Sequence, residues 1–378
     1  MNKDTSYYRY HRQLLLKEFG EEAQDKLLNA KVLVIGAGGL GCPVLLYLTA
    51  AGVGTIGIVD FDIVDITNLH RQVLYTTDDI GKPKAIIAAE KLKPLNPDVN
   101  IISFQQQLQN NNALEIIGEF DIVIDGTDNF ATRYLVNDAC VLLDKPLVYG
   151  AILRFEGQVG VFNLTDKVMK VKTNYRDLFP SAPMPDSVHS CSEAGVLGVL
   201  PGIIGTMQAN ECIKIITGTG DPLYNTILSY NSLTNQFYDF KITPERNLKH
   251  PAPATASEFR NFDYNWFCRT GNHNNEISIP DFNNLLKDEN IKTVDVREKD
   301  ELPFVTEFSH MQMPLSKFEE LINGFSVEDK VILFCQTGKR SLKAIQMLNE
   351  KFPGIAARSL QGGIEAWKKQ SLQKNRQT

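Results

Sequence analysis

The stretch from Lys31 to Asp60 constrains the possible folds more than any other part of the chain. An apolar, β-branched run from Val32 to Ile35 is typical of a buried parallel strand. Glycines with the spacing G-x-G-x-x-G follow, and the pattern then predicts a helix from Leu40 to Ala51 and a second strand from Thr55 to Val59. Because a helix N-terminus presents free N–H groups to an anion, this βαβ unit predicts a phosphate-binding turn made by Gly36, Gly38, Gly39 and Gly41.

The residues after the second strand indicate which nucleotide binds at this turn. The glycine spacing alone is compatible with NAD, FAD, SAM or ATP, so an NAD-dependent oxidoreductase remains an alternative. Asp60 ends the second strand, where its carboxylate can accept hydrogen bonds from a ribose. Carboxylates, amides and cations so close to a phosphate-binding turn favour a triphosphate with Mg²⁺ over a nicotinamide cofactor; they are Asp60, Asp62, Asn68, Arg71, Gln72 and Lys84.

A further strand is expected from Asp121 to Asp125, and it delivers the sequence GTDN at its carboxyl end. Ligands collect at the carboxyl ends of strands in an open α/β sheet, so Asp125 and Asp128 are expected beside Asp60. A carboxylate in this place can bind Mg²⁺. Asp128 could instead cap the helix that follows, but Asn129 can supply that cap, and we therefore expect Asp128 to bind the metal.

Length and composition limit the class of protein. A chain of 378 residues with 43% hydrophobic and 22% charged residues is typical of a globular protein with two domains. Its net charge of −6 argues against nucleic acid as a main partner. The uncharged stretch from Val32 to Val59 contains Pro43 and seven glycines, so we interpret it as strand–turn–helix–strand and not as a membrane span. Scattered cysteines and an N-terminus without a secretory signal predict a reducing cytoplasm.

The chain changes character twice after its first 170 residues. Residues 172–190 are polar and rich in proline, which predicts a mobile surface loop that ends at Cys191. Residues 245–275 are expected to form a linker, in which Phe259, Tyr264 and Trp266 pack against a neighbouring part of the protein. An α/β pattern then restarts. We therefore expect a first domain over residues 1–244 and a second, smaller α/β domain over residues 276–378.

A single cysteine in the second domain stands at a position that favours reactivity. A strand is expected from Val331 to Phe334, and Cys335 follows it directly. The turn that comes next leads into a helix, so backbone N–H groups and a helix N-terminus should point at the sulfur. Because cations in this turn also lower the pKa of a thiol, we predict a reactive thiolate in the loop Cys335, Gln336, Thr337, Gly338, Lys339 and Arg340.

These residues match two known families. Residues 6–244 resemble the MoeB/ThiF adenylyltransferases, relatives of the ubiquitin-activating enzymes, in RYHRQ, GAGGLG, DFDIVDITNLHRQ, GKPKA, IDGTDNFATRYLVNDAC and CSEAGVLGVLPGIIG. Residues 276–370 resemble a rhodanese domain in DVRE, CQTGKRS and LQGGIEAWKK, although the stretch between them departs from the usual pattern at HMQMP. The resemblance implies a Rossmann-like nucleotide-binding domain with a mixed sheet, fused to a smaller α/β rhodanese domain.

The resemblance to the MoeB/ThiF family implies an activity and its residues. A ubiquitin-like sulfur carrier protein of the MoaD or ThiS kind ends in Gly-Gly, and its carboxylate attacks the α-phosphorus of ATP. The glycine turn would contact the phosphates, Asp60 the ribose and Asp128 the Mg²⁺. Asn68, Arg71, Gln72 and Lys84 would contact the triphosphate. Arg12 would reach the nucleotide of a partner subunit, which implies a homodimer.

The rhodanese resemblance implies the sulfur chemistry. Cys335 would carry sulfur as a persulfide, taken from a cysteine desulfurase or from thiosulfate, and the carrier would become a thiocarboxylate. Cys191 matches a loop cysteine that links covalently to the carrier in some members. Many members bind zinc through two C-x-x-C pairs, but this chain has Asn174 and Asp177 at the first pair and RNLKHPAPA at the second, so we predict no zinc site.

Several alternatives remain open at this point. The pathway is expected to be molybdopterin synthesis, with thiamine synthesis or tRNA thiolation as alternatives. An ATP-dependent dehydratase acting on tRNA would need no rhodanese domain, and the acidic chain disfavours it. A phosphatase would place arginine six positions after the cysteine, where this chain has Ser341. A non-catalytic scaffold would not need a polar residue at every nucleotide-contacting position.

Overall fold

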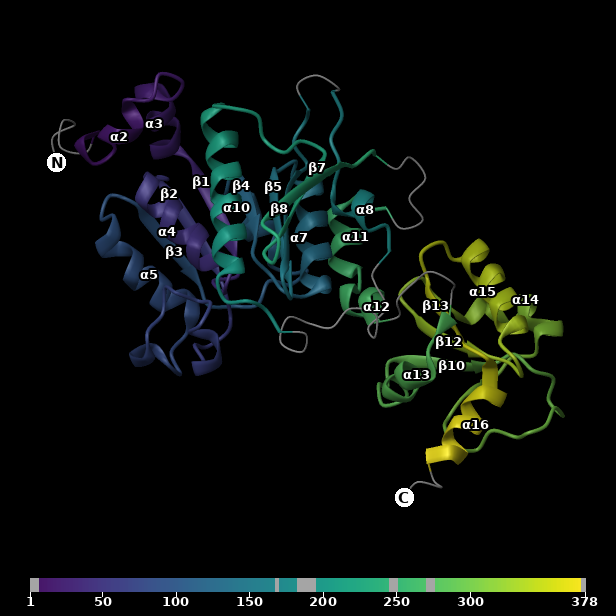
Figure 1. The fold of residues 1–378 in the computed structure, drawn as a ribbon. Helices are drawn as coiled ribbons and strands as arrows, with labels where there is room; N and C mark the ends of the chain where they lie inside the picture. Colours follow the sequence, from purple (N-terminus) through teal and green to yellow (C-terminus); the bar gives the residue numbers. More distant parts are fainter. Residues whose placement is uncertain (1–6, 167–169, 182–194, 245–250, 270–275, 375–378) are drawn as a thin grey trace. The chain divides into compact units, whose positions relative to one another are not determined.

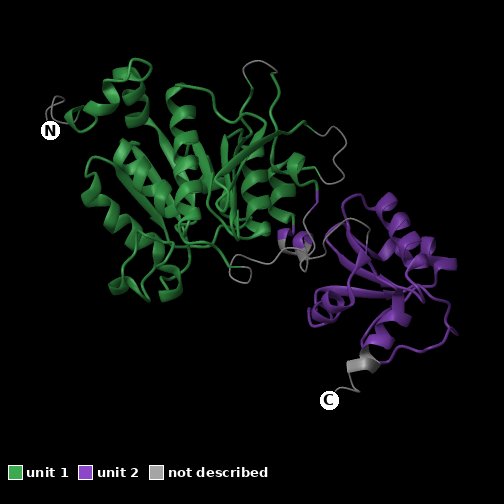
Figure 2. Cartoon of the chain, in the orientation of Figure 1, with its two compact units in different colours: residues 1–180, 189–262 green, residues 181–188, 263–378 purple. Residues whose placement is uncertain are grey.

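The computed structural model describes residues 7–166, 170–181, 195–244, 251–269 and 276–374 (Figure 1). The chain divides into two compact units, one of residues 1–180 and 189–262 and the other of residues 181–188 and 263–378 (Figure 2). The sequence predicted an α/β protein with two sheets, and this prediction is confirmed. The two units are described separately below.

The first unit is built on an eight-stranded mixed sheet with the order β3-β2-β1-β4-β5-β6-β7-β8. The five strands from β3 to β5 are parallel, and β6, β7 and β8 continue the sheet in antiparallel pairs. Their bounds are β1 Lys31–Ile35, β2 Thr55–Val59, β3 Asn100–Phe104, β4 Ile122–Asp125, β5 Leu147–Leu153, β6 Glu156–Phe162, β7 Thr226–Asn231 and β8 Gln236–Lys241.

Helices cover this sheet and close its core. The helices α4, α5 and α10 contribute to one hydrophobic cluster with β1, β2 and β4. Helix α10 packs beside α4 (Figure 1). The helices of the unit are α2 His11–Leu14, α3 Gly20–Asn29, α4 Gly41–Ala51, α5 Lys84–Leu95, α6 Ala113–Gly118, α7 Phe130–Leu142, α8 Tyr175–Leu178, α10 Leu200–Thr217 and α11 Ala256–Asn261, with short 3-10 turns at Ile66–Asn68 and Thr77–Asp79.

The glycine turn between β1 and α4 is packed too closely for side chains. Gly36 has a φ of +91°, and a Cβ atom on it would lie 2.8 Å from the carbonyl oxygen of Gly126. A Cβ atom on Gly41 would lie 1.9 Å from the carbonyl oxygen of Gly36. These two glycines therefore allow the turn to fold back against the first turn of α4 and against the end of β4.

The second unit has a five-stranded parallel sheet with the order β11-β10-β12-β13-β9. Alternate residues of its central strand β12 enter two different hydrophobic clusters, one with α15 and the other with α13 and α16, as the period of two in a strand requires. Its elements are α12 Tyr264–Arg269, β9 Glu276–Ile277, α13 Ile279–Leu285, β10 Ile291–Asp295, β11 Met311–Gln312, α14 Phe318–Leu321, β12 Lys330–Phe334, α15 Lys339–Lys351, β13 Ala356–Leu360 and α16 Gly363–Lys374, with 3-10 turns at Leu315–Lys317 and Ile322–Gly324.

The uncharged stretch from Val32 to Val59 folds as β1, the glycine turn, α4 and β2, which confirms that interpretation of it. Within the described residues, no helix combines the length and the apolarity needed to cross a membrane. Part of the expected linker is helical, because α11 and α12 lie within it. Phe259 of α11 is fully buried, and Asn110 donates hydrogen bonds to the carbonyl groups of Phe259 and Phe262, so α11 belongs to the first unit, whereas α12 belongs to the second.

Candidate active sites

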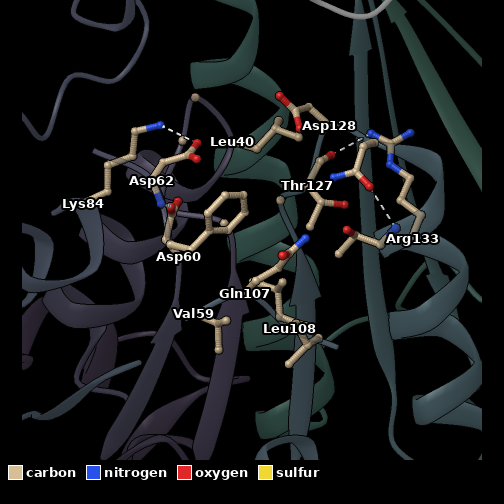
Figure 3. A pocket seen from close by; sticks show the side chains of 18 of the residues that line it. Leu40, Val59, Asp60, Asp62, Lys84, Gln107, Leu108, Thr127, Asp128 and Arg133 are labelled. Atoms are coloured by element: carbon tan, nitrogen blue, oxygen red, sulfur yellow. Dashed lines mark hydrogen bonds and ion pairs between the residues drawn. The ribbon is translucent and has the colours of Figure 1, made fainter. Parts of the chain in front are cut away.

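A pocket in the first unit lies at the carboxyl ends of β1, β2 and β4 (Figure 3). This is the edge at which ligands bind in open α/β sheets. In Figure 3 Asp60, Asp62 and Lys84 stand on one side of the pocket, and Asp128 and Arg133 stand on the opposite side. The residues predicted from the sequence that line it are Gly36, Gly38, Gly39, Asp60, Asp62, Arg71, Gln72, Lys84 and Asp128.

Asp60 connects the end of β2 to the glycine turn. One of its carboxylate oxygens accepts a hydrogen bond from the N–H of Ala37 at 2.8 Å, and the other accepts one from the N–H of Asp62 at 2.8 Å. Burial raises the pKa of Asp60, although these hydrogen bonds oppose the rise. The carboxylate lines the pocket and keeps lone pairs beyond the two that it uses, so it can both hold the turn and accept hydroxyl groups from a ribose.

Cations and amides complete this side of the pocket. The Lys84 ammonium group is 3.1 Å from a carboxylate oxygen of Asp62, and the Lys84 side chain is only 7% exposed. Arg71 donates to the carbonyl oxygen of Thr67 at 2.8 Å. Gln72 is buried, and its Oε1 atom has no hydrogen-bond partner among the described residues. Because a buried polar atom without a partner is costly, Gln72 suits a site that a polar ligand completes.

Asp128 is available to a ligand because its neighbour caps the helix. The side chain of Asn129 accepts a hydrogen bond from the N–H of Thr132 at 2.9 Å at the start of α7, as predicted. Asp128 is exposed and lines the pocket, so its carboxylate fits a hydrated Mg²⁺. Asp125 does not line the pocket, contrary to prediction. It is buried and accepts hydrogen bonds from the N–H and the hydroxyl group of Thr127, which shape the loop after β4.

Arg133 is a pocket residue that the sequence does not predict. It lines the pocket at 9% exposure, and its Nη2 atom donates to the carbonyl oxygen of Thr127 at 2.8 Å. Its guanidinium group also lies 5.6 Å from the ring centroid of Tyr149. A sequence signal existed for Gln106, Gln107 and Leu108, because they follow β3, which ends at the same edge of the sheet as β1 and β2. The other lining residues that the sequence analysis does not single out include Phe61, Thr127, Thr132 and Ile152.

Three further predicted residues of this site that the structure describes do not line the pocket. Gly41 packs against Gly36 behind the pocket surface, and the Asn68 side chain accepts from the N–H of Asp65, capping a 3-10 turn. Arg12 is exposed on α2 and does not line the pocket. Cys191 lies outside the described residues.

The second site is the loop that follows β12. Cys335 is 1% exposed at the end of that strand, and its sulfur accepts a hydrogen bond from the N–H of Gly338 at 3.2 Å. The hydroxyl group of Ser341 lies 3.5 Å from the same sulfur. Burial raises the pKa of the Cys335 thiol, but hydrogen bonds from Ser341 and from backbone N–H groups of the loop outweigh it, so that the pKa is lowered. The predicted direction of this shift is confirmed.

The cations of the loop contribute less to this shift than the sequence suggests. Arg340 stands in the first turn of α15, and both of its terminal nitrogens donate to the carboxylate of Glu301. This carboxylate offsets the charge of the guanidinium group. Lys339 is exposed at the start of the helix. Hydrogen bonds, chiefly from Ser341, therefore lower the pKa of the Cys335 thiol more than the positive charges of the loop do.

The segment expected to lack zinc ligands is held by polar contacts instead. Asn174 and Asp177 form a capping box at α8, and Arg176 makes a fully buried ion pair with Asp138 of α7 at 2.6 Å. Among the described residues, no group of three or more histidine, cysteine, aspartate or glutamate side chains could hold a metal ion. The absence of zinc stays a prediction.

Two family models match this chain, one over its first part and the other over its second. The model of the ThiF family matches residues 10–252, and that of the rhodanese-like domain matches residues 278–370. The sulfur carrier protein adenylyltransferase of Thermus thermophilus is 50% identical over 261 residues, which cover 69% of this chain and 96% of that protein. The probable adenylyltransferase/sulfurtransferase MoeZ of Mycobacterium tuberculosis is 40% identical over 375 residues, with 96% and 93% of the two chains covered.

Two further relatives extend the comparison. The adenylyltransferase and sulfurtransferase MOCS3 of Arabidopsis thaliana is 37% identical over 391 residues, which cover 95% of this chain and 83% of that protein. Among solved structures, E. coli MccB with AMPCPP and MccA has a TM-score of 0.55 at 23% identity, covering 66% of this chain and 74% of that chain, and shows the shared fold. The chain therefore belongs to the ThiF family and carries a rhodanese-like domain, which makes it an adenylyltransferase and sulfurtransferase of the MoeZ and MOCS3 type.

Proposed function

We propose that the chain adenylates the C-terminal Gly-Gly of a small ubiquitin-like sulfur carrier protein in the pocket of Figure 3. The carrier carboxylate attacks the α-phosphorus of ATP, the bond to the bridging oxygen breaks, and pyrophosphate leaves. The name of one relative, the sulfur carrier protein adenylyltransferase of Thermus thermophilus, supports this substrate. The observation that carries the proposal is the set of cations, carboxylates and an unpartnered amide around the glycine turn.

Each residue has a distinct part in this step. Lys84 and Arg71 offset the charge on the phosphates, and Asp60 holds the ribose. The Lys84 ammonium group pairs with Asp62 at 3.1 Å. To offset the charge of the phosphates, it must either leave Asp62 or contact both Asp62 and the phosphates. Asp128 would hold Mg²⁺, which supplies further charge neutralisation on the phosphates. The chemistry then depends on positioning and on charge more than on a general base.

The sulfur step is assigned to Cys335. A donor persulfide or thiosulfate transfers its sulfane sulfur to the Cys335 thiolate, and the resulting persulfide attacks the acyl-adenylate and displaces AMP. A second thiol must then cleave the acyl disulfide to release the thiocarboxylate. The lowered pKa of the Cys335 thiol supports this assignment, because the thiolate is the attacking form. Cys191 is proposed to link to the carrier.

A homodimer belongs to the same proposal. The N-terminal segment exposes Tyr8, Leu15 and Leu16 at 79%, 59% and 56%, and a second copy would cover them. Arg12 lies in this segment and would reach the nucleotide of the partner subunit. We favour molybdopterin synthesis as the pathway, with thiamine synthesis or tRNA thiolation as alternatives. A relative named "probable molybdopterin-synthase adenylyltransferase" supports this choice.

Separate mutations test whether the two sites do separate chemistry. Lys84→Ala and Asp128→Ala should abolish carrier-dependent adenylation and leave sulfur transfer from thiosulfate to cyanide intact. Cys335→Ala should do the reverse. If both activities fall together in all three variants while the proteins stay folded, the assignment of two sites is wrong.

A further inference from the structure

A carboxylate outside the cysteine loop holds one of the loop's cations. Glu301 follows β10, and its two carboxylate oxygens accept from the two terminal nitrogens of Arg340, with Nη2 at 2.6 Å from Oε2. One of these oxygens also accepts a hydrogen bond from the N–H of Glu298 at 2.9 Å, which holds the carboxylate in position to pair with the guanidinium group. Because the contact is bidentate, Arg340 has both a fixed position and a neutralised charge.

The segment that carries Glu301 is attached to the cysteine loop at a second point. Arg297 pairs with Asp295 at 2.7 Å, and both side chains are buried. The Nη1 atom of Arg297 also donates to the carbonyl oxygen of Pro303 at 2.9 Å and to the side chain of Gln336 at 3.4 Å. Glu301 therefore lies on a segment tied to the end of β10 and to the loop after β12, so it keeps its place beside Arg340.

The ion pair is more exposed than the sulfur. The side chains of Arg340 and Glu301 are 35% and 30% exposed, whereas Cys335 is 1% exposed. Glu301 raises the pKa of Arg340, and the Cys335 thiolate adds to that rise, so the guanidinium group interacts with both. A second carboxylate, that of Glu365, accepts a hydrogen bond from Gln336 of the loop at 2.8 Å. Glu301 thus offsets the charge of Arg340, and Glu365 adds a second carboxylate beside the loop.

We propose that Glu301 determines the donor specificity of the sulfur site, because it neutralises Arg340 and so disfavours small dianionic donors relative to persulfides of organic thiols. The proposal rests on the assignment of Cys335 as the sulfur-carrying residue. With thiosulfate, the thiolate attacks the outer sulfur, a new S–S bond forms, and sulfite leaves with the electron pair of the old S–S bond. With a persulfide donor, the same S–S exchange releases a thiolate.

Only the thiosulfate reaction brings a dianion to the thiolate. An unpaired Arg340 would attract that dianion, and Glu301 removes the attraction. A zwitterionic donor such as cysteine persulfide carries less net charge and depends less on Arg340. Glu301 should therefore raise the KM for thiosulfate and change kcat much less.

The test compares Glu301→Gln with Glu328→Gln in the full chain. Glu328 is exposed and precedes β12, whereas Cys335 follows that strand, so Glu328→Gln removes the same charge at the opposite end of the sheet. Sulfur transfer to cyanide is measured with thiosulfate and with cysteine persulfide. At low salt, Glu301→Gln should lower the KM for thiosulfate by about three- to tenfold, as expected for a unit charge acting on a dianion near a protein surface.

Three further readouts make the result decisive. The kcat with thiosulfate and the KM for cysteine persulfide should stay within twofold of the parent chain, and Glu328→Gln should change neither. The effect on thiosulfate should shrink in 0.5 M salt, about where charges are screened over a few ångströms. An unchanged or higher KM for thiosulfate, or equal changes with both donors, would overturn the role of Glu301. Activity that survives Cys335→Ala would instead overturn the assignment of the sulfur site.

Discussion

Ser341 should control the reactivity of Cys335 through one hydrogen bond. Its hydroxyl group is fully buried, 3.5 Å from the sulfur of Cys335, 3.0 Å from the carbonyl oxygen of Gly338 and 2.7 Å from the hydroxyl group of Ser359. If Ser359 donates to Ser341, the proton of Ser341 remains for the sulfur or for the carbonyl oxygen. Ionisation of the thiol turns that proton toward the sulfur, so Ser341 stabilises the thiolate.

The size of the effect follows from this shared proton. A hydrogen bond from a neutral hydroxyl group contributes about 1 kcal/mol, and this energy corresponds to about a fivefold change in an equilibrium constant. Ser341→Ala removes the bond and raises the pKa of the Cys335 thiol above its value in the parent chain, where hydrogen bonding outweighs burial. At a pH below the pKa of the thiol in the parent chain, the thiolate fraction of Ser341→Ala should be about fivefold lower than that of the parent. At high pH both proteins are fully ionised, and their rates should converge.

The assay is the rate of alkylation of Cys335 by iodoacetamide from pH 5 to 10, followed by mass spectrometry of its peptide. Burial raises the pKa of Cys42 to about 12 and also raises the pKa of Cys140 and Cys212, so these cysteines should react slowly. Ser326→Ala, an exposed serine before β12, is the matched control. Alkylation of Ser341→Ala at pH 6 that is as fast as in the parent chain would refute the reasoning.

Three other predictions concern the first unit. Arg133→Met should lower kcat/KM for adenylation at least tenfold, because a charged hydrogen bond to the Thr127 carbonyl contributes about 1.5–3 kcal/mol. Arg133→Lys should lower it less, and an unchanged kcat/KM in Arg133→Met would contradict the prediction. Arg176→Met should destabilise the unit by about 3–5 kcal/mol in urea unfolding, because it removes the cation that pairs with the buried Asp138 carboxylate. A second change in the same chain, Asp138→Leu, should recover most of this loss of stability. Elemental analysis of the purified chain should find no stoichiometric zinc, and one zinc per chain would disprove that prediction.

The parts of this protein that sequence patterns predict are local ones. The turn from Gly36 to Gly41 depends on residues a few positions apart, since each glycine is required by close backbone approach within the same unit. The cap by Asn129 is likewise a contact over three residues, and it leaves Asp128 free for a ligand. Cys335 follows a recognisable strand and precedes a helix, so the environment of its sulfur is also set within six residues.

The parts that the sequence does not predict depend on residues that are distant in the chain. Glu301 and Arg340 are brought together only by the pairing of β10 with β12, and nothing near Arg340 reveals its partner. Arg133 is recognisable as a pocket residue only once its helix is placed beside β4 and β5. Asp125 looked like a ligand-binding carboxylate because it ends a central strand, but the loop after it turns the side chain inward to Thr127.

The measurement that tests the central claim most directly is ATP–pyrophosphate exchange with candidate carrier proteins. We predict exchange that requires one carrier, is lost when its terminal glycine is removed, and is lost in Lys84→Ala but not in Cys335→Ala. That result would identify the reaction, the substrate and the pathway together. A folded, ATP-binding chain that supports no exchange with any carrier ending in Gly-Gly would contradict the proposed function.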